Sequence, residues 1–181
     1  MGLYTYEDNS LLRDIVHWLV DIIVIIAFAW FLVYGFLGQT MISGHSMLPT
    51  LEAEDMCLVN RVCYDVGNPK RFDIVVFERE DTKQLNIKRV IGLPGDTIQI
   101  VGGSVYVNNY KIDHPQVGTV SLPGIAENPV ELQKGEYFLL GDNADSSEDS
   151  RFSNIGNVKR DNIKGKVWFR LKPFKNIGFI D

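Results

Sequence analysis

The stretch TIQIVGGSVYVNNYKI, residues 97–112, decides the class of fold. Apolar and polar residues alternate along it, and the alternation is interrupted at Gly102-Gly103 and at Asn109. A period of two residues is typical of a strand with one buried face, while glycine pairs and asparagine favour the tight turns of hairpins. This stretch therefore predicts consecutive β-hairpins.

Short β-rich runs lie on both sides of these hairpins. They carry many β-branched and aromatic residues, which favour strands. The runs are MCLVNRV from Met56, DIVVF from Asp73, LNIKRVIG from Leu85, EYFLL from Glu136 and KVWFRL from Lys166. The last two runs are expected to form a further pair of strands.

Residues 113–135 interrupt this pattern. The segment contains Pro115, Pro123 and Pro129, and its apolar residues are irregularly spaced. Such a segment is typical of a loop, so we expect an exposed excursion from the sheet. The whole pattern predicts a mainly β fold, in which residues 38–181 form a single β-rich domain.

A long apolar run precedes the β-rich part. Residues 22–37, IIVIIAFAWFLVYGFL, carry no charge, and the segment from Trp18 onwards would span about 30 Å as a helix. Asp21 would lie near the membrane interface and the helix N-terminus, where a negative charge is tolerated. Residues 18–37 are therefore predicted to be a transmembrane helix.

A cleavable signal peptide is the alternative interpretation of this run. The preceding residues include Glu7, Asp8 and Asp14 against Arg13 alone, and no small-residue cleavage site follows the run. These features favour an uncleaved anchor.

The charges around the run predict its orientation. Arg13 precedes it, and the next basic residue is Arg61. By the positive-inside rule, residues 1–17 form a short cytoplasmic leader, and the β-rich domain lies on the outer face of the cell membrane.

Composition and cysteine usage exclude two classes of function. The chain has 18 Lys and Arg against 23 Asp and Glu, and this net charge of -5 argues against nucleic acid as a partner. Cys57 and Cys63 would be about 20 Å apart on one extended strand, so two buried free thiols are expected and a CxxC redox or zinc site is excluded.

Three polar segments are candidates for the chemistry. The first is SGHSMLPT, residues 43–50, which places Ser46 in a turn between Gly44 and Pro49. A serine hydroxyl needs a neighbouring base to become a nucleophile. Taken alone, the segment is more typical of a plain surface turn.

The second segment, IKRVIGLPGD at residues 87–96, places two cations in an apolar strand. Lys88 and Arg89 should point to opposite faces, so one of them must approach the interior. Burial without a counter-ion lowers the pKa of a lysine, and its neutral amine is a competent base. The commoner alternative is a lysine whose stem is buried and whose charge reaches water.

The third segment, GDNADSSEDSR at residues 141–151, combines acids, hydroxyls and one arginine that can brace one another. A solvated acidic loop is the alternative. A calcium loop is excluded, because Ala144 and Ser147 stand where its pattern requires an acid or amide and a glycine. We expect neither a metal ion nor a cofactor.

Taken together, and in this order after an apolar helix, the three segments resemble the conserved boxes of the bacterial signal peptidase I family. The resemblance covers most of residues 39–171. It implies a membrane-bound serine endopeptidase in which Ser46 is the nucleophile and Lys88 is the general base. DIVVF from Asp73 is implied to be a structural strand between them.

The resemblance also implies supporting groups. Ser147 matches the family serine that orients the lysine amine. Asp149 and Arg151 match a salt-bridged pair, and Asp142 is a second supporting carboxylate.

The family's substrates are secretory preproteins, cleaved after small residues such as Ala-x-Ala. The resemblance therefore implies two shallow apolar pockets, which Ile42 and Ile87 would help to line, although both side chains suit the core equally well. The expected partners are these preproteins and the lipid bilayer. The oligomeric state stays open, with a monomer favoured.

Four departures from the family pattern concern the supporting groups. Some members have a serine that helps to bind the oxyanion where this chain has Gly44, in addition to the N–H of the nucleophile. Ala144 replaces a usual arginine, Phe72 replaces a frequent glycine, and the spacing between Arg151 and Gly156 is longer.

Three other functions fit parts of the sequence. A Ser-His-Asp protease would use His45 or His114, but His45 points away from Ser46 on an extended chain, and His114 lies in a proline-rich segment. A membrane-tethered, non-catalytic peptide-binding module would not need Ser46 or Lys88. A self-cleaving repressor with a Ser-Lys pair is disfavoured by the membrane span and the acidic chain.

Overall fold

The computed structural model of the chain describes residues 10–180, which divide into two compact units at Leu37 and Gly38. Part of the expected leader, residues 1–9, lies outside the described residues.

The first unit is a single helix, α1 (Ser10–Phe36). Within it, Arg13–Phe31 form a stretch of 19 residues with a mean hydropathy of 2.0, which is long and apolar enough to cross a membrane. A helix satisfies its own backbone hydrogen bonds, as a membrane span requires. This stretch overlaps the predicted span at residues 18–31 and begins before it.

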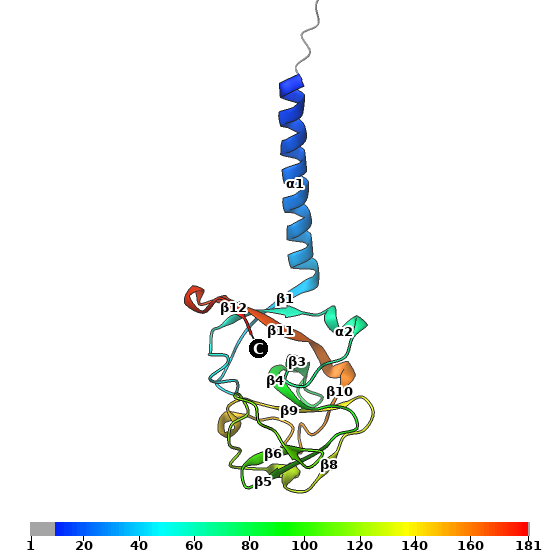
Figure 1. Cartoon of the computed structure of the whole chain (residues 1–181), viewed down its shortest axis with the longest axis vertical. Coiled ribbons are helices and arrows are strands. Elements are labelled where there is room, and N and C mark those ends of the chain that lie inside the picture. Colours follow the sequence, from blue (N-terminus) through cyan, green and yellow to red (C-terminus); the bar gives the residue numbers. More distant parts are fainter. Residues whose placement is uncertain (1–9, 181) are drawn as a thin grey trace, which may run out of the picture. The chain divides into compact units, whose positions relative to one another are not determined.

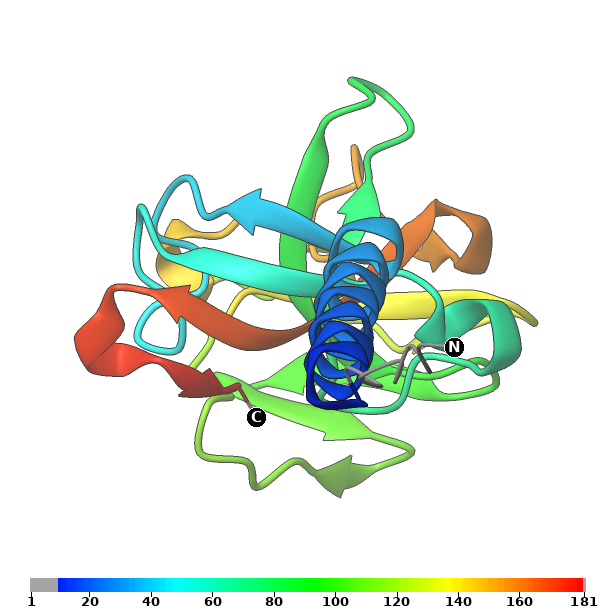
Figure 2. The ribbon, with the colours of Figure 1, turned by 90° about the horizontal axis from the view of Figure 1, so that it is seen from above.

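The second unit contains an eight-stranded sheet with the order β1-β2-β11-β3-β4-β9-β10, in which β12 also pairs with β11 (Figures 1 and 2). The pairs from β2 to β10 are antiparallel. The strands are β1 (Leu37–Met41), β2 (Met56–Asn60), β3 (Ile74–Glu78), β4 (Leu85–Gly92), β9 (Glu136–Leu140), β10 (Val158–Lys159), β11 (Ile163–Lys172) and β12 (Gly178–Phe179). Short helices connect them: α2 (Cys63–Val66), η2 (Ala144–Ser146), η3 (Arg160–Asn162) and η4 (Phe174–Asn176).

The predicted hairpins form a second, four-stranded sheet with the order β7-β6-β5-β8. Its strands are β5 (Thr97–Val101), β6 (Ser104–Val107), β7 (Tyr110–Lys111) and β8 (Val130–Glu131). Gly102 and Gly103 have φ of 54° and 77°, and Asn108 and Asn109 have φ of 52° and 68°. Positive φ at both central residues is what a tight two-residue hairpin turn requires. The prediction of consecutive hairpins is confirmed.

The expectation that residues 113–135 form an exposed excursion is wrong in part. The segment contains η1 (Gly124–Glu127) and β8, which pairs with β5. Its Val120, Ala126 and Leu132 are buried in the same cluster as the apolar side chains of β5 and β6. The irregular apolar spacing reflects a segment that contacts the core at isolated points.

The expected pairing of EYFLL with KVWFRL is also wrong. Both runs form strands, but β9 pairs with β4 and β10, whereas β11 pairs with β2, β3 and β12. The strands β3 and β4 lie between them. Four of the five β3 residues are buried, and such apolar strands occupy the centre of a sheet.

Both cysteines are free thiols, as predicted, but the expected burial holds for Cys57 alone, since Cys63 is half-buried. Cys57 is buried on β2, and Cys63 begins α2. They do not share one strand, because β2 ends at Asn60.

Gly92, at the end of β4, lies where the two sheets approach each other. A substitution at this position tests the packing between the sheets. A Cβ atom at this position would meet the Leu132 side chain and would lie 2.9 Å from both Ile98 Cδ1 and Phe138 Cβ. Gly92→Ala should therefore lower the free energy of unfolding by about 1 to 3 kcal/mol, measured by denaturant unfolding. Gly118→Ala is the matched control, because a Cβ there has no neighbour within 4 Å. Equal stability of the two variants would contradict this packing.

Candidate active site

The structure brings Ser46 and Lys88 together. Lys88 Nζ lies 2.9 Å from Ser46 Oγ and 3.1 Å from the carbonyl oxygen of Ile87. The lysine projects from β4, where it is paired with Val75 of the central strand β3, and only 4% of its surface is exposed. A serine hydroxyl and a lysine amine are thus within hydrogen-bonding distance, which is the arrangement that covalent catalysis by a serine would require.

Burial sets the acidity of this lysine. Loss of hydration lowers the pKa of Lys88 to about 8, although the carboxylates of Asp149 and Glu148 oppose the shift. A substantial fraction of the amine is therefore neutral at mildly alkaline pH and able to accept a proton.

The Ser46 turn is held from two sides. On one side, the side chains of Met47 and Leu51 are buried in the core and anchor the turn to it. From the third polar segment, the Asn143 N–H donates to Ser46 O at 3.0 Å, and Asn143 Nδ2 donates to His45 O at 3.1 Å. Sequence reasoning missed Asn143, which gave no signal beyond its place in that segment.

These contacts leave the N–H of Ser46 without a hydrogen-bond acceptor among residues 10–180. Such an N–H can stabilise an oxyanion. Gly44 has a φ of 93°, and no atom lies within 4 Å of a Cβ atom added to it. There is therefore empty space beside this residue.

Asp149 and Arg151 form a buried ion pair. Arg151 Nε lies 2.8 Å from Asp149 Oδ1, and both side chains are almost fully buried. The Ser147 hydroxyl donates to Asp149 Oδ2 at 2.6 Å, and the Gly141 N–H donates to the same oxygen at 3.1 Å. The hydroxyl of Ser147 therefore contacts the carboxylate, while the Lys88 amine donates to Ser46 and Ile87.

Asp142 forms a second buried pair, with Arg89. Two guanidinium nitrogens, Nε and an Nη, lie 2.8 Å from its two oxygens, and Thr50 Oγ1 donates to Oδ2 at 2.5 Å. Sequence reasoning expected one of Lys88 and Arg89 to be interior, but both are buried, because both faces of β4 are covered. Arg89 was therefore missed as a site residue.

A small hollow adjoins the Ser46–Lys88 pair. Its volume is about 60 Å³, and Ile42 and Ile87 line it together with Met47 and Val76. Ile42 is also part of the core, in contact with the same cluster as Ile87. The hollow is too small for a bulky side chain.

The edge of β4 beside this hollow is unpaired. β4 pairs with β3 along Leu85–Arg89, but it pairs with β9 only from Arg89 onwards. Within residues 10–180, positions 85–88 therefore leave one backbone edge free. Such an edge can accept an extended peptide as an additional strand.

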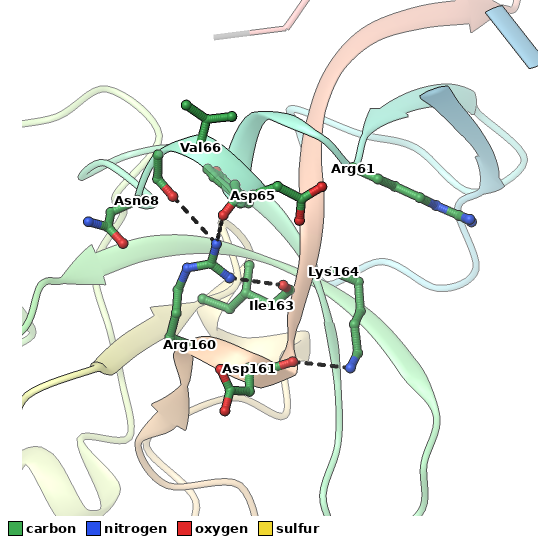
Figure 3. Close-up of a pocket in the computed structure, with 10 residues that line it drawn as sticks. Arg61, Asp65, Val66, Asn68, Arg160, Asp161, Ile163 and Lys164 are labelled. Carbon is green, nitrogen blue, oxygen red and sulfur yellow. Dashed lines mark hydrogen bonds between the residues drawn. The ribbon is translucent and has the colours of Figure 1, made fainter. Parts of the chain in front are cut away.

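A larger hollow of about 650 Å³ lies elsewhere, around α2 and η3 (Figure 3). Its central cation, Arg160, donates to the carbonyl oxygens of Tyr64, Gly67 and Ile163. Lys164 Nζ donates to Asp161 O at 3.1 Å. The residues that line it include neither a serine nor a threonine, so it lacks the aliphatic hydroxyl that a serine peptidase uses.

His114 does not form a triad with Ser46. Its ring stacks on Phe72 with centroids 3.9 Å apart, and its Nδ1 accepts the Gln116 N–H at 3.4 Å. Burial lowers the pKa of His114. His45 is exposed, and among residues 10–180 neither histidine hydrogen-bonds to Ser46.

The structure explains why glycine suits the position of Phe72. Its φ is 72°, a conformation that costs a side-chain-bearing residue about 1 kcal/mol or more. Two backbone hydrogen bonds hold it there: its N–H donates to Val90 O at 2.8 Å, and its oxygen accepts from Arg89 at 2.9 Å. The stack with His114 adds packing that glycine would lack.

The other two departures have structural roles of their own. The backbone oxygen of Ala144 accepts from Arg151 at 2.6 Å, so the position contributes its carbonyl. The longer segment after Arg151 forms a turn, closed by Gly156 N–H to Phe152 O at 2.8 Å. Within it, Asn154 donates to Glu148 at 2.6 Å.

Comparisons with known proteins identify the family of this chain. A family model described as signal peptidase, peptidase S26, matches residues 15–172, which places the chain among the serine peptidases. Signal peptidase I of Bacillus caldolyticus is 37% identical over 175 residues, covering 90% of this chain and 92% of that protein. Signal peptidase I of Leptolyngbya laminosa is 39% identical over 145 residues, covering 76% of this chain and 70% of that protein.

The chain therefore belongs to the signal peptidase family, peptidase S26, and the resemblance to bacterial signal peptidase I is confirmed. It is a serine peptidase, a hydrolase of peptide bonds. A crystal structure of a signal peptidase I from Enterococcus faecalis V583 aligns with 56% of this chain and 97% of that chain, with a TM-score of 0.46 and 28% identity.

A substitution of Gly141 tests how closely the Ser46 turn packs against the segment that carries Ser147. A Cβ atom there would meet the Ser147 hydroxyl and would lie 2.5 Å from both Ser147 Cβ and Ser46 O. Gly141→Ala should displace the Ser46 turn and lower kcat/KM by about 100-fold or more, measured with a peptide substrate. Gly178→Ala is the control, since an added Cβ there meets nothing within 4 Å. Full activity of Gly141→Ala would refute this assembly.

Proposed function

We propose that this peptidase removes N-terminal signal peptides from exported preproteins by a Ser-Lys dyad, with Ser46 as nucleophile and Lys88 as general base. The observation that carries the proposal is the 2.9 Å contact between Ser46 Oγ and the buried Lys88 Nζ. The names of its relatives support the substrate class.

Substrate binding follows from the free edge and the small hollow. The signal peptide would lie extended along residues 85–88 of β4, sharing backbone hydrogen bonds with the strand. Small side chains of an Ala-x-Ala-like motif would enter the hollow beside Ile42 and Ile87. The scissile carbonyl would then lie against Ser46 Oγ.

The chemical steps use the side chains of Ser46 and Lys88, the backbone N–H of Ser46 and one water molecule. The neutral amine of Lys88 takes the Ser46 proton as Oγ attacks the carbonyl carbon. The N–H of Ser46 stabilises the oxyanion. Lys88 then protonates the leaving amine and activates the water that hydrolyses the acyl-enzyme. Asp149–Arg151 and Asp142–Arg89 brace the elements that carry the pair, and Ser147 orients the site through Asp149.

The apolar helix α1 would anchor the enzyme beside its membrane-borne substrates. We assign residues 1–17 to a cytoplasmic leader, 18–37 to the span and 38–181 to a catalytic domain on the outer face. Confinement of enzyme and preprotein to one bilayer raises their effective concentration. The proposed partners are preproteins and lipid, with the enzyme acting as a monomer.

Cleavage of a secretory precursor with an Ala-x-Ala site tests the proposal. The detergent-solubilised full chain would be compared with Ser46→Ala, Lys88→Ala and His114→Ala from about pH 6 to about pH 10. Ser46→Ala and Lys88→Ala should lose at least about a thousandfold in kcat/KM, because each lacks half of the nucleophile–base unit. His114→Ala should retain most of its activity.

The activity of the unaltered chain should rise with pH as Lys88 loses its proton, with a midpoint near its pKa of about 8. Loss of activity in His114→Ala alone would instead support a Ser-His-Asp protease. A folded chain that cleaves no precursor would support the peptide-binding module.

A further inference from the structure

Three carboxylates raise the pKa of Lys88, and each of them is paired with an arginine. Burial lowers the pKa of the lysine, Asp149, Glu148 and Asp142 raise it, and Arg79 lowers it. Asp149 is paired with Arg151, and Asp142 is paired with Arg89. The third carboxylate, Glu148, is paired with Arg79, which lies outside the three polar segments that suggested the site.

Arg79 joins two elements of the site. It follows β3 and closes the turn that leads into β4, since its N–H donates to Gln84 O at 2.9 Å. Its Nη1 lies 2.5 Å from Glu148 Oε2, in the loop between Ser147 and Asp149. The arginine therefore connects the turn before the lysine strand with the loop that carries Ser147 and Asp149.

The Arg79–Glu148 ion pair is held in place by burial and by further hydrogen bonds to both residues. Arg79 is only 9% exposed, and it forms a second, bidentate contact with Asp81, at 2.9 and 2.7 Å. Asn154 holds the other oxygen of Glu148 at 2.6 Å. The forked guanidinium suits such a double contact, which a lysine cannot reproduce. Hydrogen bonds from Asn154 and Arg79 lower the pKa of Glu148, so it is ionised.

We propose that Arg79 is a positioning residue of the Ser46–Lys88 site, which holds the Ser147–Asp149 loop against the β3–β4 turn and neutralises Glu148. The inference rests on the proposed role of Lys88 as the base. A base must lose its proton to act, and an uncompensated carboxylate nearby would favour its ammonium form. Arg79 thus keeps the amine available without touching it.

A double-mutant cycle of Arg79 and Glu148 tests this role. The measured quantity is the pH dependence of kcat/KM for cleavage of an Ala-x-Ala peptide. Arg79→Gln leaves Glu148 unneutralised, raises the pKa of Lys88, and should move the midpoint of the rising limb to higher pH by about half a unit or more. Glu148→Gln removes the carboxylate and should move the midpoint to lower pH. The double variant should return the midpoint close to that of the unaltered chain.

Two further variants separate charge from structure. Arg79→Lys keeps the positive charge but loses the fork, so its midpoint should stay near the original while kcat falls several-fold. Arg71→Gln is the matched control: it also breaks an arginine–carboxylate pair, 3.1 Å from Asp96, but Arg71 is not one of the charges with the largest effect on the pKa of Lys88. Its midpoint should not move.

An unchanged midpoint in both Arg79→Gln and Glu148→Gln would overturn the inference, as would an equal loss of activity at every pH. Glu148 is about half exposed, so Glu148→Gln should fold even if Arg79→Gln does not. In that case the midpoint of the pH profile of Glu148→Gln alone tests the inference, and an unchanged midpoint overturns it. A failure of the dyad itself would be seen separately, as activity that persists in Lys88→Ala.

Discussion

The buried amine of Lys88 imposes the constraint on which the rest of the site depends. A lysine removed from water is stabilised as a cation by any free carboxylate, and a cation cannot act as a base. The protein places Lys88 against Ser46 Oγ and a carbonyl oxygen, and it pairs the neighbouring acids with arginines. The acids can therefore brace the site without holding the proton on the lysine.

The sheet order explains how distant segments meet around this amine. β4 is central, with β3 on one side and β9 on the other. Lys88 and Arg89 point to opposite faces of β4, so one strand supplies both the proposed base and the partner of Asp142. The segment after β9 returns over the Ser46 turn, where Asn143 contacts Ser46 and His45. Within the described part of the chain, the same strand also leaves one backbone edge unpaired at residues 85–88, where we propose that the substrate binds.

Much of this was predictable from the sequence, and the failures have physical causes. Alternation and turn residues located the hairpins. Ser46 and Lys88 were singled out only by the joint resemblance of the three polar segments to the signal peptidase I family, and the structure places their side chains 2.9 Å apart. Strand partners were not predictable, because pairing depends on which strands are buried on both faces; EYFLL and KVWFRL are therefore separated. Arg79 and Asn143 gave no signal, since an arginine after a strand or an asparagine in a loop is usually solvated. Their roles depend on contacts 69 and 98 residues away in sequence.

A direct titration of Lys88 tests the central claim most closely. The full chain, solubilised in detergent and labelled with ¹³C-lysine, would be titrated by NMR, and the Lys88 signal would be assigned by its loss in Lys88→Arg. The account predicts a pKa of about 8 for this amine. A pKa near the ordinary value of 10.5 would contradict it, because the lysine would then be a paired cation rather than the base.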